Sequence, residues 1–413
     1  MEPARLVGSG FSPLDEELAL TAGNLVPSLQ EHVTHLASWM PFGRAAQMLE
    51  RLLGVHVSEA TIRRHTEAAG ALYEQEQTAA SQQAASGNEW LAPASPVPQR
   101  LVLSGDGAFV GLVKGAWAEV RTLVIGAVDP AASSQHEVRA HTLSYFSRMT
   151  DAATFAELAE VETQRRGVVQ AEQVCAVTDG AEWLQGFIDL HRGDALRILD
   201  FPHAAQRFGL IAEALEQQGY PLPVHWVHQQ CHDLKQHGPA DVLERLRSLP
   251  ATDASEEHLH YLEKREALMQ YPAYRAAGWP IGSGMVESGN KVVMQTRLKG
   301  AGMRWAPTHV NPMLALRTAV CNDRWDEAWQ QVRVIQHRRR LSRRLQRASA
   351  RRTALVSFLL LALVRLRPDL ALPCSSLPRH SPPPATLPGS SRPSPHHPWK
   401  RLPACRPTLA AKI

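Results

Sequence analysis

The amino-acid sequence predicts an α/β protein with a helical region before its sheet and a helical block inserted late in the sheet-forming part. Apolar runs of strand length alternate with helical repeats between residues 100 and 200. Two of these runs lead directly to an aspartate followed by a glycine. Between about 204 and 278 the apolar spacing is helical throughout, so we expect an all-α insertion there.

Composition excludes several classes of protein. The 413 residues have room for two or three domains, and a hydrophobic content of 44% with 20% charged residues is ordinary for a soluble protein. Five cysteines without a C-x-x-C spacing indicate reduced thiols in a cytosolic protein rather than a disulfide framework. The apolar stretch 353–366 is too short for a bilayer span and carries Arg365, so we expect no membrane partner. No Walker-type phosphate loop occurs, which argues against an ATP-driven machine.

Residues 1–92 are predicted to form an N-terminal helical DNA-binding region. Leu29, Val33 and Leu36 recur at helical spacing. A helix, a turn at Gly54 and a second helix capped by Ser58 then form a helix-turn-helix at about 41–68.

The second helix of this pair carries the residue types of a DNA reader. Thr61, Arg63, Arg64 and His65 lie along it. A helical hairpin that only packs is the alternative, and the sequence leaves it open. The helical pattern continues to a proline-rich stretch, which predicts a linker at 93–99.

Residues 100–203 are predicted to form the first part of the core. The strand and helix signals, in order, are strands at 100–103, 109–117 and 119–128, a helix at 151–166, a strand at 174–178, a helix at 181–191 and a strand at 195–199. The first strand leads to Asp106 and the fourth to Asp179. This β-β-β-α-β-α-β order, with acids at those two strand ends, is the ribonuclease-H-like arrangement.

The remaining chain is predicted as an α-helical insertion at 204–278, a final part of the core at 279–332, a basic helix at 333–367 and a proline-rich disordered tail at 368–413. The final core part carries Glu287 on a helix from about 285 to 298. The stretch 333–352 contains nine arginines and no acid, which indicates a segment that follows nucleic-acid phosphates or a solvated basic helix.

Asp106, Asp179 and Glu287 are the candidate catalytic and metal-binding residues. Three carboxylates delivered by two strands and a helix suit a two-metal phosphoryl-transfer site, with two Mg²⁺ or Mn²⁺ ions. The alternative is that each Asp-Gly pair simply forms a turn.

Three other groups of polar residues each allow a functional and a structural interpretation. Asp200 and His203 either support the catalytic site or cap a helix. Four residues at helical spacing form a conceivable zinc site, although the polar face of an inserted helix explains them better; they are His225, His228, Cys231 and His232. Five residues after Glu287 suit phosphate binding and base stacking, or else a solvated basic helix with a core tryptophan; they are Lys291, Arg297, Lys299, Arg304 and Trp305.

Several motifs occur in an order that resembles one known family. They are MPFGRAA at 40–46, SGDGA at 104–108, WAEV at 117–120, VTDGAEW at 177–183, LDFPHAA at 199–205, PIGSGMVES at 280–288 and KGAGMRW at 299–305. Over about residues 10–345 the chain resembles the ISKra-type DDE transposases of bacterial insertion sequences, which are relatives of the Mutator-like group.

The resemblance implies a function and assigns residues to it. Asp106, Asp179 and Glu287 match the DDE triad, and Asp200 with His203 matches the Asp-x-x-His signature of Mutator-like enzymes. The implied activity is metal-dependent DNA cleavage at the ends of the element, followed by strand transfer. The implied partners are the transposon ends, the target DNA and further copies of the chain on that DNA, in the bacterial cytoplasm at the nucleoid.

Two departures from the family pattern define the alternatives. The stretch 10–16 resembles a segment that follows a Cys-x-x-Cys knuckle, whereas this chain starts without those cysteines. The apolar stretch 354–366 differs from the polar helix expected there. We therefore expect an N-terminally truncated copy, and the first alternative is an inactive transposase that acts only as a DNA-binding protein or repressor. The second alternative is a ribonuclease-H-like nuclease.

Overall fold

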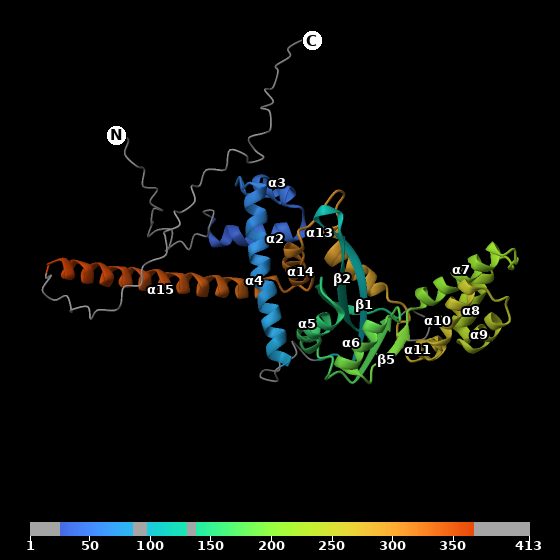
Figure 1. Ribbon diagram of the computed structural model, residues 1–413. Helices are drawn as coiled ribbons and strands as arrows, with labels where there is room; N and C mark the ends of the chain where they lie inside the picture. Colours follow the sequence, from blue (N-terminus) through green and yellow to red (C-terminus); the bar gives the residue numbers. More distant parts are fainter. Residues whose placement is uncertain (1–24, 86–96, 130–137, 367–413) are drawn as a thin grey trace, which may run out of the picture. The chain divides into compact units, whose positions relative to one another are not determined.

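The computed structural model describes residues 25–85, 97–129 and 138–366 (Figure 1). The predicted tail at 368–413, the stretch 10–16 and most of the linker at 93–99 lie outside the described residues. The chain divides into two units, 1–341 and 342–413, and each is described by itself. In the part of the chain that is described, no helix is long and apolar enough to cross a bilayer.

The first unit contains one mixed sheet of five strands, in the order β3-β2-β1-β4-β5. The strands are β1 (Arg100–Gly111), β2 (Trp117–Ala127), β3 (His141–Arg148), β4 (Gln173–Thr178) and β5 (Leu196–Leu199). β1, β2 and β3 pair antiparallel, whereas β4 pairs parallel with both β1 and β5. Helices accompany the sheet, so the predicted α/β class is confirmed.

Two strand predictions were wrong. β1 does not end at Asp106 but continues to Gly111, because Asp106 pairs with Thr122 and Gly107 with Arg121 in β2. The predicted strand at 109–117 is instead the end of β1, a 3₁₀ turn η1 (Val113–Gly115) and the start of β2. The third strand, β3, was not predicted at all.

Helices pack on both faces of the sheet. Leu101 and Leu103 of β1 share a buried cluster with α5 (Ala152–Arg165) and α6 (Glu182–Arg192). The intervening Val102 belongs to a different cluster, which includes α7 (Phe201–Gln217). This alternation is what a strand buried on both faces requires.

The predicted insertion is a block of helices between β5 and the last part of the core (Figure 1). It comprises α7, α8 (Trp226–His237), α9 (Ala240–Arg247), α10 (Asp253–Glu263), a short η2 (Glu266–Leu268) and α11 (Tyr271–Ala276). The chain leaves and rejoins the core at neighbouring points, since Phe201 N–H donates to the carbonyl of Ile281 at 2.9 Å.

The C-terminal helices differ from the prediction in detail. They are α12 (Gly284–Gly289), a π-helix η3 (Asn290–Gln295), α13 (Thr296–Leu298), α14 (Pro307–Cys321) and α15 (Trp325–Leu366). The expected helix at 285–298 is present, but one π-helical stretch interrupts it. A break with a positive φ at Asp323 separates α14 from α15.

The N-terminal helices are α2 (Pro27–Trp39), α3 (Phe42–Leu53) and α4 (Glu59–Ala85). Gly54 ends α3 in the left-handed conformation, and the Ser58 hydroxyl accepts from Thr61 N–H at 3.3 Å, as the helix-turn-helix prediction requires. α4 is one long helix that packs along α14 and α5 (Figure 1).

Two buried arginines join α2 to the π-helix. Arg297 Nε donates to the Ala37 carbonyl at 2.8 Å, and Arg317 donates to the Ser38 carbonyl at 3.0 Å. Arg317 also donates to the carbonyls of Val292 and Val293 in η3. Cations at the C-terminal end of α2 complement its dipole and satisfy carbonyls that the helix leaves unpaired.

Candidate active site at one edge of the sheet

Asp106 and Asp179 lie at the same edge of the sheet. The parallel pairing of β1 with β4 stops at Leu103 and Ala176. β4 ends two residues later and Asp179 follows it, while β1 continues through Asp106 in the hairpin with β2. Both aspartates are half-buried. The two aspartates therefore lie near each other, just beyond the point where the pairing of β1 with β4 stops.

The Asp106 carboxylate is held by two hydrogen bonds. Gly107 N–H donates to Oδ1 at 2.7 Å, and the Asn290 amide donates to Oδ2 at 2.7 Å. Burial raises the pKa of Asp106 above its usual range, and the charge of Asp179 raises it further. Asp179 Oδ1 accepts from Ala181 N–H at 2.9 Å. Asp179 is thus close enough for its charge to affect Asp106.

Asp200 and His203 form a hydrogen-bonded pair near Asp106 and Asp179. Asp200 is fully buried, and its Oδ2 lies 2.6 Å from His203 Nδ1. Its Oδ1 accepts from Ser283 N–H at 2.5 Å. The pKa of His203 is raised, mainly by the hydrogen bond with Asp200 and further by Asp179 and Asp106. Since Nδ1 is engaged by Asp200, Nε2 is the nitrogen left for a group in the site.

Glu287 is placed differently from the two aspartates. It lies on α12, which packs against β1 and β2, but its side chain is exposed. Over the described ranges, no group of three or more His, Cys, Asp or Glu side chains is arranged to hold a metal ion. Asp106, Asp179 and Asp200 nevertheless lie near enough to His203 for their charges to act on it, whereas Glu287 is exposed and lies outside that cluster.

Asn290 is a site residue that the sequence analysis missed. It lies one turn after Glu287 and is almost fully buried, and its amide contacts Asp106. Its Oδ1 is buried without a hydrogen-bond partner. The signal available in the sequence was its position three residues after the predicted acid on a helix, which puts both on one face.

The predicted DNA-binding residues divide into exposed and buried groups. Five are exposed, as DNA contact requires: Arg63, Arg64, Lys291, Lys299 and Arg304. Thr61 is half-buried and accepts from the Ser58 hydroxyl at 3.0 Å, and His65 beside it is buried.

Arg297 and Trp305 correct the prediction of DNA contact. Arg297 is 1% exposed, lies over the rings of Phe42 and Trp305, and burial lowers its pKa to about 10. Trp305 is buried, and its Nε1 donates to the Leu298 carbonyl at 3.1 Å. Both side chains face the core under α2 and α3, so neither is available to a nucleic acid.

The histidines and the cysteine of the conceivable zinc site belong to the helical block. His225 precedes α8 with a positive φ, and His228, Cys231 and His232 lie on that helix. Cys231 packs against the core of the block, while His232 lies beside Asp233.

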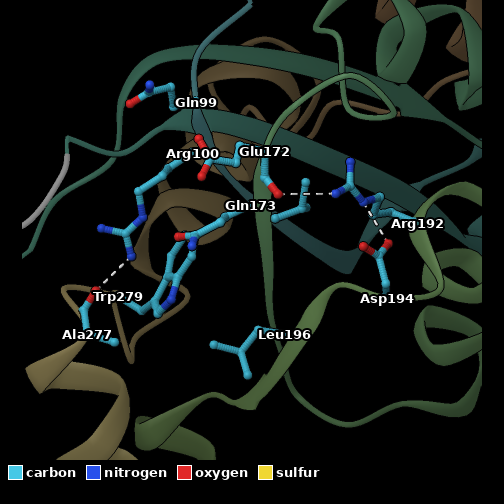
Figure 2. A pocket seen from close by; sticks show the side chains of 10 residues that line it. Gln99, Arg100, Glu172, Gln173, Arg192, Asp194, Leu196, Ala277 and Trp279 are labelled. Atoms are coloured by element: carbon cyan, nitrogen blue, oxygen red, sulfur yellow. Dashed lines mark hydrogen bonds and ion pairs between the residues drawn. The ribbon is translucent and has the colours of Figure 1, made fainter.

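A cavity of about 630 Å³ lies at the opposite edge, where β1, β4 and β5 begin (Figure 2). Figure 2 shows Arg100 over the ring of Trp279, and Arg192 paired with Asp194 at 2.7 Å. Arg100 also donates to the Ala277 carbonyl at 2.8 Å. None of the predicted site residues lines this cavity, and its arginines already have partners within the fold.

Comparison with known proteins adds no assignment. The chain matches no protein family that was searched. No curated protein matches it either.

Proposed function

We propose that the protein is a DNA transposase that cleaves DNA with the help of metal ions and transfers the cut strand. The proposal depends above all on the neighbouring carboxylates of Asp106 and Asp179, which lie just beyond the parallel pairing of β1 with β4, and on Asp200 and His203 next to them. The strand order, with three antiparallel strands followed by two parallel ones, supports a ribonuclease-H-like core.

The donor atoms at this edge fit divalent cations. Asp106 and Asp179 supply carboxylate oxygens, and Asn290 Oδ1 is a buried oxygen without a partner. Hard ions such as Mg²⁺ and Mn²⁺ prefer such ligands. The Glu287 carboxylate is exposed and lies outside the cluster, but it precedes Asn290 by only three residues, and we assign it as the third carboxylate. Two bound ions would lower the pKa of the attacking hydroxyl and stabilise the leaving oxygen.

The protein residues have separate tasks in this proposal. Asp106 and Asp179 would bind the ions, and Asn290 orients Asp106. Asp200 is buried and holds His203 by Nδ1, so the imidazole can place its other nitrogen toward the reacting phosphate. A histidine whose pKa is raised carries positive charge more readily, which suits a neighbour with negative charge.

Exposed basic groups support DNA as the substrate. Arg63 and Arg64 lie on the second helix of the helix-turn-helix. The arginines of α15 between 338 and 352 are largely exposed, as contact with backbone phosphates requires. We accordingly propose transposon ends and target DNA as partners, several copies of the chain on that DNA, and action on the bacterial nucleoid.

A nicking and joining assay tests the proposal. Wild-type protein is incubated with DNA that carries the ends of its element, with Mg²⁺, with Mn²⁺ or with a chelator. Asp106→Asn should abolish both steps and leave DNA binding in place. Asp241→Asn, an exposed acid on α9, is the matched control and should behave as wild type. Retained strand transfer in Asp106→Asn would refute the assignment.

The same assay separates the alternatives. DNA binding by the wild type without metal-dependent nicking would identify an inactive DNA-binding protein or repressor. Nicking without joining would identify a nuclease.

A further inference from the structure

The β1–β2 hairpin extends beyond the pairing of β1 with β4 and presents two exposed aromatic rings. Phe109 and Trp117 are each 56% exposed, although both lie within strands. The register pairs Gly111 with Trp117 and Phe109 with Glu119. The two rings therefore lie diagonally on the same face of the hairpin.

Positive charge accompanies these rings. The Arg304 guanidinium lies 5.0 Å from the centre of the Trp117 ring. It extends across Gly111, where a Cβ would come within 2.3 Å of it. Lys114 in the turn is exposed as well. The acid on this face, Glu119, is paired with Arg121 at 2.6 Å, so its charge is compensated.

The aromatic face is the reverse side of the strand that carries Asp106. Successive side chains of a strand point to opposite faces, so Asp106 and Phe109 lie on opposite sides of β1. Three residues of strand span about 10 Å. The rings therefore lie about 10 Å along β1 from Asp106, on the opposite face of the strand.

We propose that this face binds single-stranded DNA next to the cleavage site, with unpaired bases stacked on Phe109 and Trp117 and a phosphate held by Arg304. The proposal rests on the proposed function. Aromatic side chains with interleaved cations are the usual platform for single strands, because every base has a face that stacks. A second copy is a poorer occupant, since two faces that each carry Arg304 and Lys114 would repel each other.

Fluorescence of a single-stranded oligonucleotide containing 2-aminopurine tests this surface. Stacking of the probe base on an aromatic ring should quench its emission on binding to the wild type. Phe109→Ala and Trp117→Ala should each lose part of the quenching and weaken binding by about fivefold to a hundredfold, the range for one stacked base. Trp117→Phe should retain most of both. Tyr220→Ala, an exposed aromatic in the helical block, should have no effect.

Gly111→Ala is a second, independent probe. The added methyl group must displace the Arg304 guanidinium without removing its charge. Binding should weaken in this variant, and the salt dependence of binding should fall as it does in Arg304→Ala.

The outcomes separate this surface from the proposed function. Unchanged affinity and quenching in the Phe109→Ala, Trp117→Ala double variant overturn the surface, even if nicking remains dependent on Asp106. Absence of single-strand binding by the wild type overturns it as well. If the variants change the oligomeric state but not DNA binding, the face is a contact between copies and the proposal is wrong. Failure of the proposed function alone would appear as normal stacking without metal-dependent cleavage.

Discussion

α4 lies tightly against α14 at Gly70, and the replacement of this glycine by alanine has a calculable effect on stability. A Cβ at this position would lie 2.5 Å from the Pro312 carbonyl oxygen and 2.8 Å from the carbonyl carbon. Because both atoms are backbone, the contact is relieved only if one helix moves. Overpacking of this kind costs about 1–3 kcal/mol.

The higher helix propensity of alanine stabilises the Gly70→Ala variant and so opposes the steric cost. A control variant with the same gain in propensity but no steric contact removes this contribution. Alanine is better than glycine inside a helix by about 1 kcal/mol, which conceals part of the steric cost. Gly209 lies within α7, and a Cβ there would meet nothing within 4 Å. Gly209→Ala should therefore be more stable than wild type by about 1 kcal/mol. The difference between the two variants isolates the contact and should be about 1–3 kcal/mol.

Urea unfolding followed by circular dichroism measures this difference. Gly70→Ala should unfold at a lower urea concentration than Gly209→Ala, with a similar slope. If the two variants are equally stabilised, α4 does not lie against α14 as described. The position of α4, which carries Arg63, relative to Asp106 and Asp179 would then be unknown.

Three further outcomes are expected. Asn290→Ala removes a donor to Asp106 and should weaken Mn²⁺ binding, measured by electron paramagnetic resonance, by about tenfold to a hundredfold; unchanged affinity would deny Asn290 its orienting role. Arg317→Met removes the donor from two buried carbonyls and from the partly buried carbonyl of Val292. This should lower the free energy of unfolding by about 3 kcal/mol, and a loss below about 1 kcal/mol would contradict that account. The pKa of Glu160 is lowered mainly by a hydrogen bond from His191, so this group stabilises the fold above the usual carboxyl pKa and the effect disappears as pH falls through the depressed value. Glu160→Gln should be less stable than wild type near neutral pH, and urea midpoints between pH 5 and pH 3 should fall less in the variant.

The spacing of apolar residues predicted those helices and strands that have a clear local sequence pattern. α5, β4, α6 and β5 appear within a residue or two of the expected positions, because each has a distinct apolar spacing and a turn or cap at its ends. The extent of β1 was not predictable in this way. An Asp-Gly pair favours a turn locally, and only the pairing of Asp106 and Gly107 with β2 keeps the strand extended through it.

The two aspartates of the candidate site were predictable from the sequence, whereas Asn290 was not. Asp106 and Asp179 follow apolar runs in strands that pair parallel, so the two residues lie near each other beyond the paired stretch even though β1 itself continues. Asn290 was missed because an amide has no distinctive sequence signal, and its contact with Asp106 joins residues 184 positions apart. Arg297 and Trp305 were assigned to DNA because residue type does not reveal which side of a helix is buried. The π-helical turn before Arg297 also alters which side that is.

The helical block between β5 and α12 is a place where the chain can accept insertions and deletions. Its two ends are adjacent, and the cost of closing a loop grows by only about 0.6 kcal/mol for each doubling of its length. Insertions and deletions in its outer turns should therefore leave the acids where they are. The exceptions include Tyr261 and Arg265, which donate to the carbonyls of Asp179 and Gly180 at 2.5 and 2.8 Å, and Tyr271, which donates to the Leu199 carbonyl at 2.9 Å. A shortened or transplanted block has to preserve those contacts, His203 at the start of α7 and the apolar side chains that share a core with the sheet.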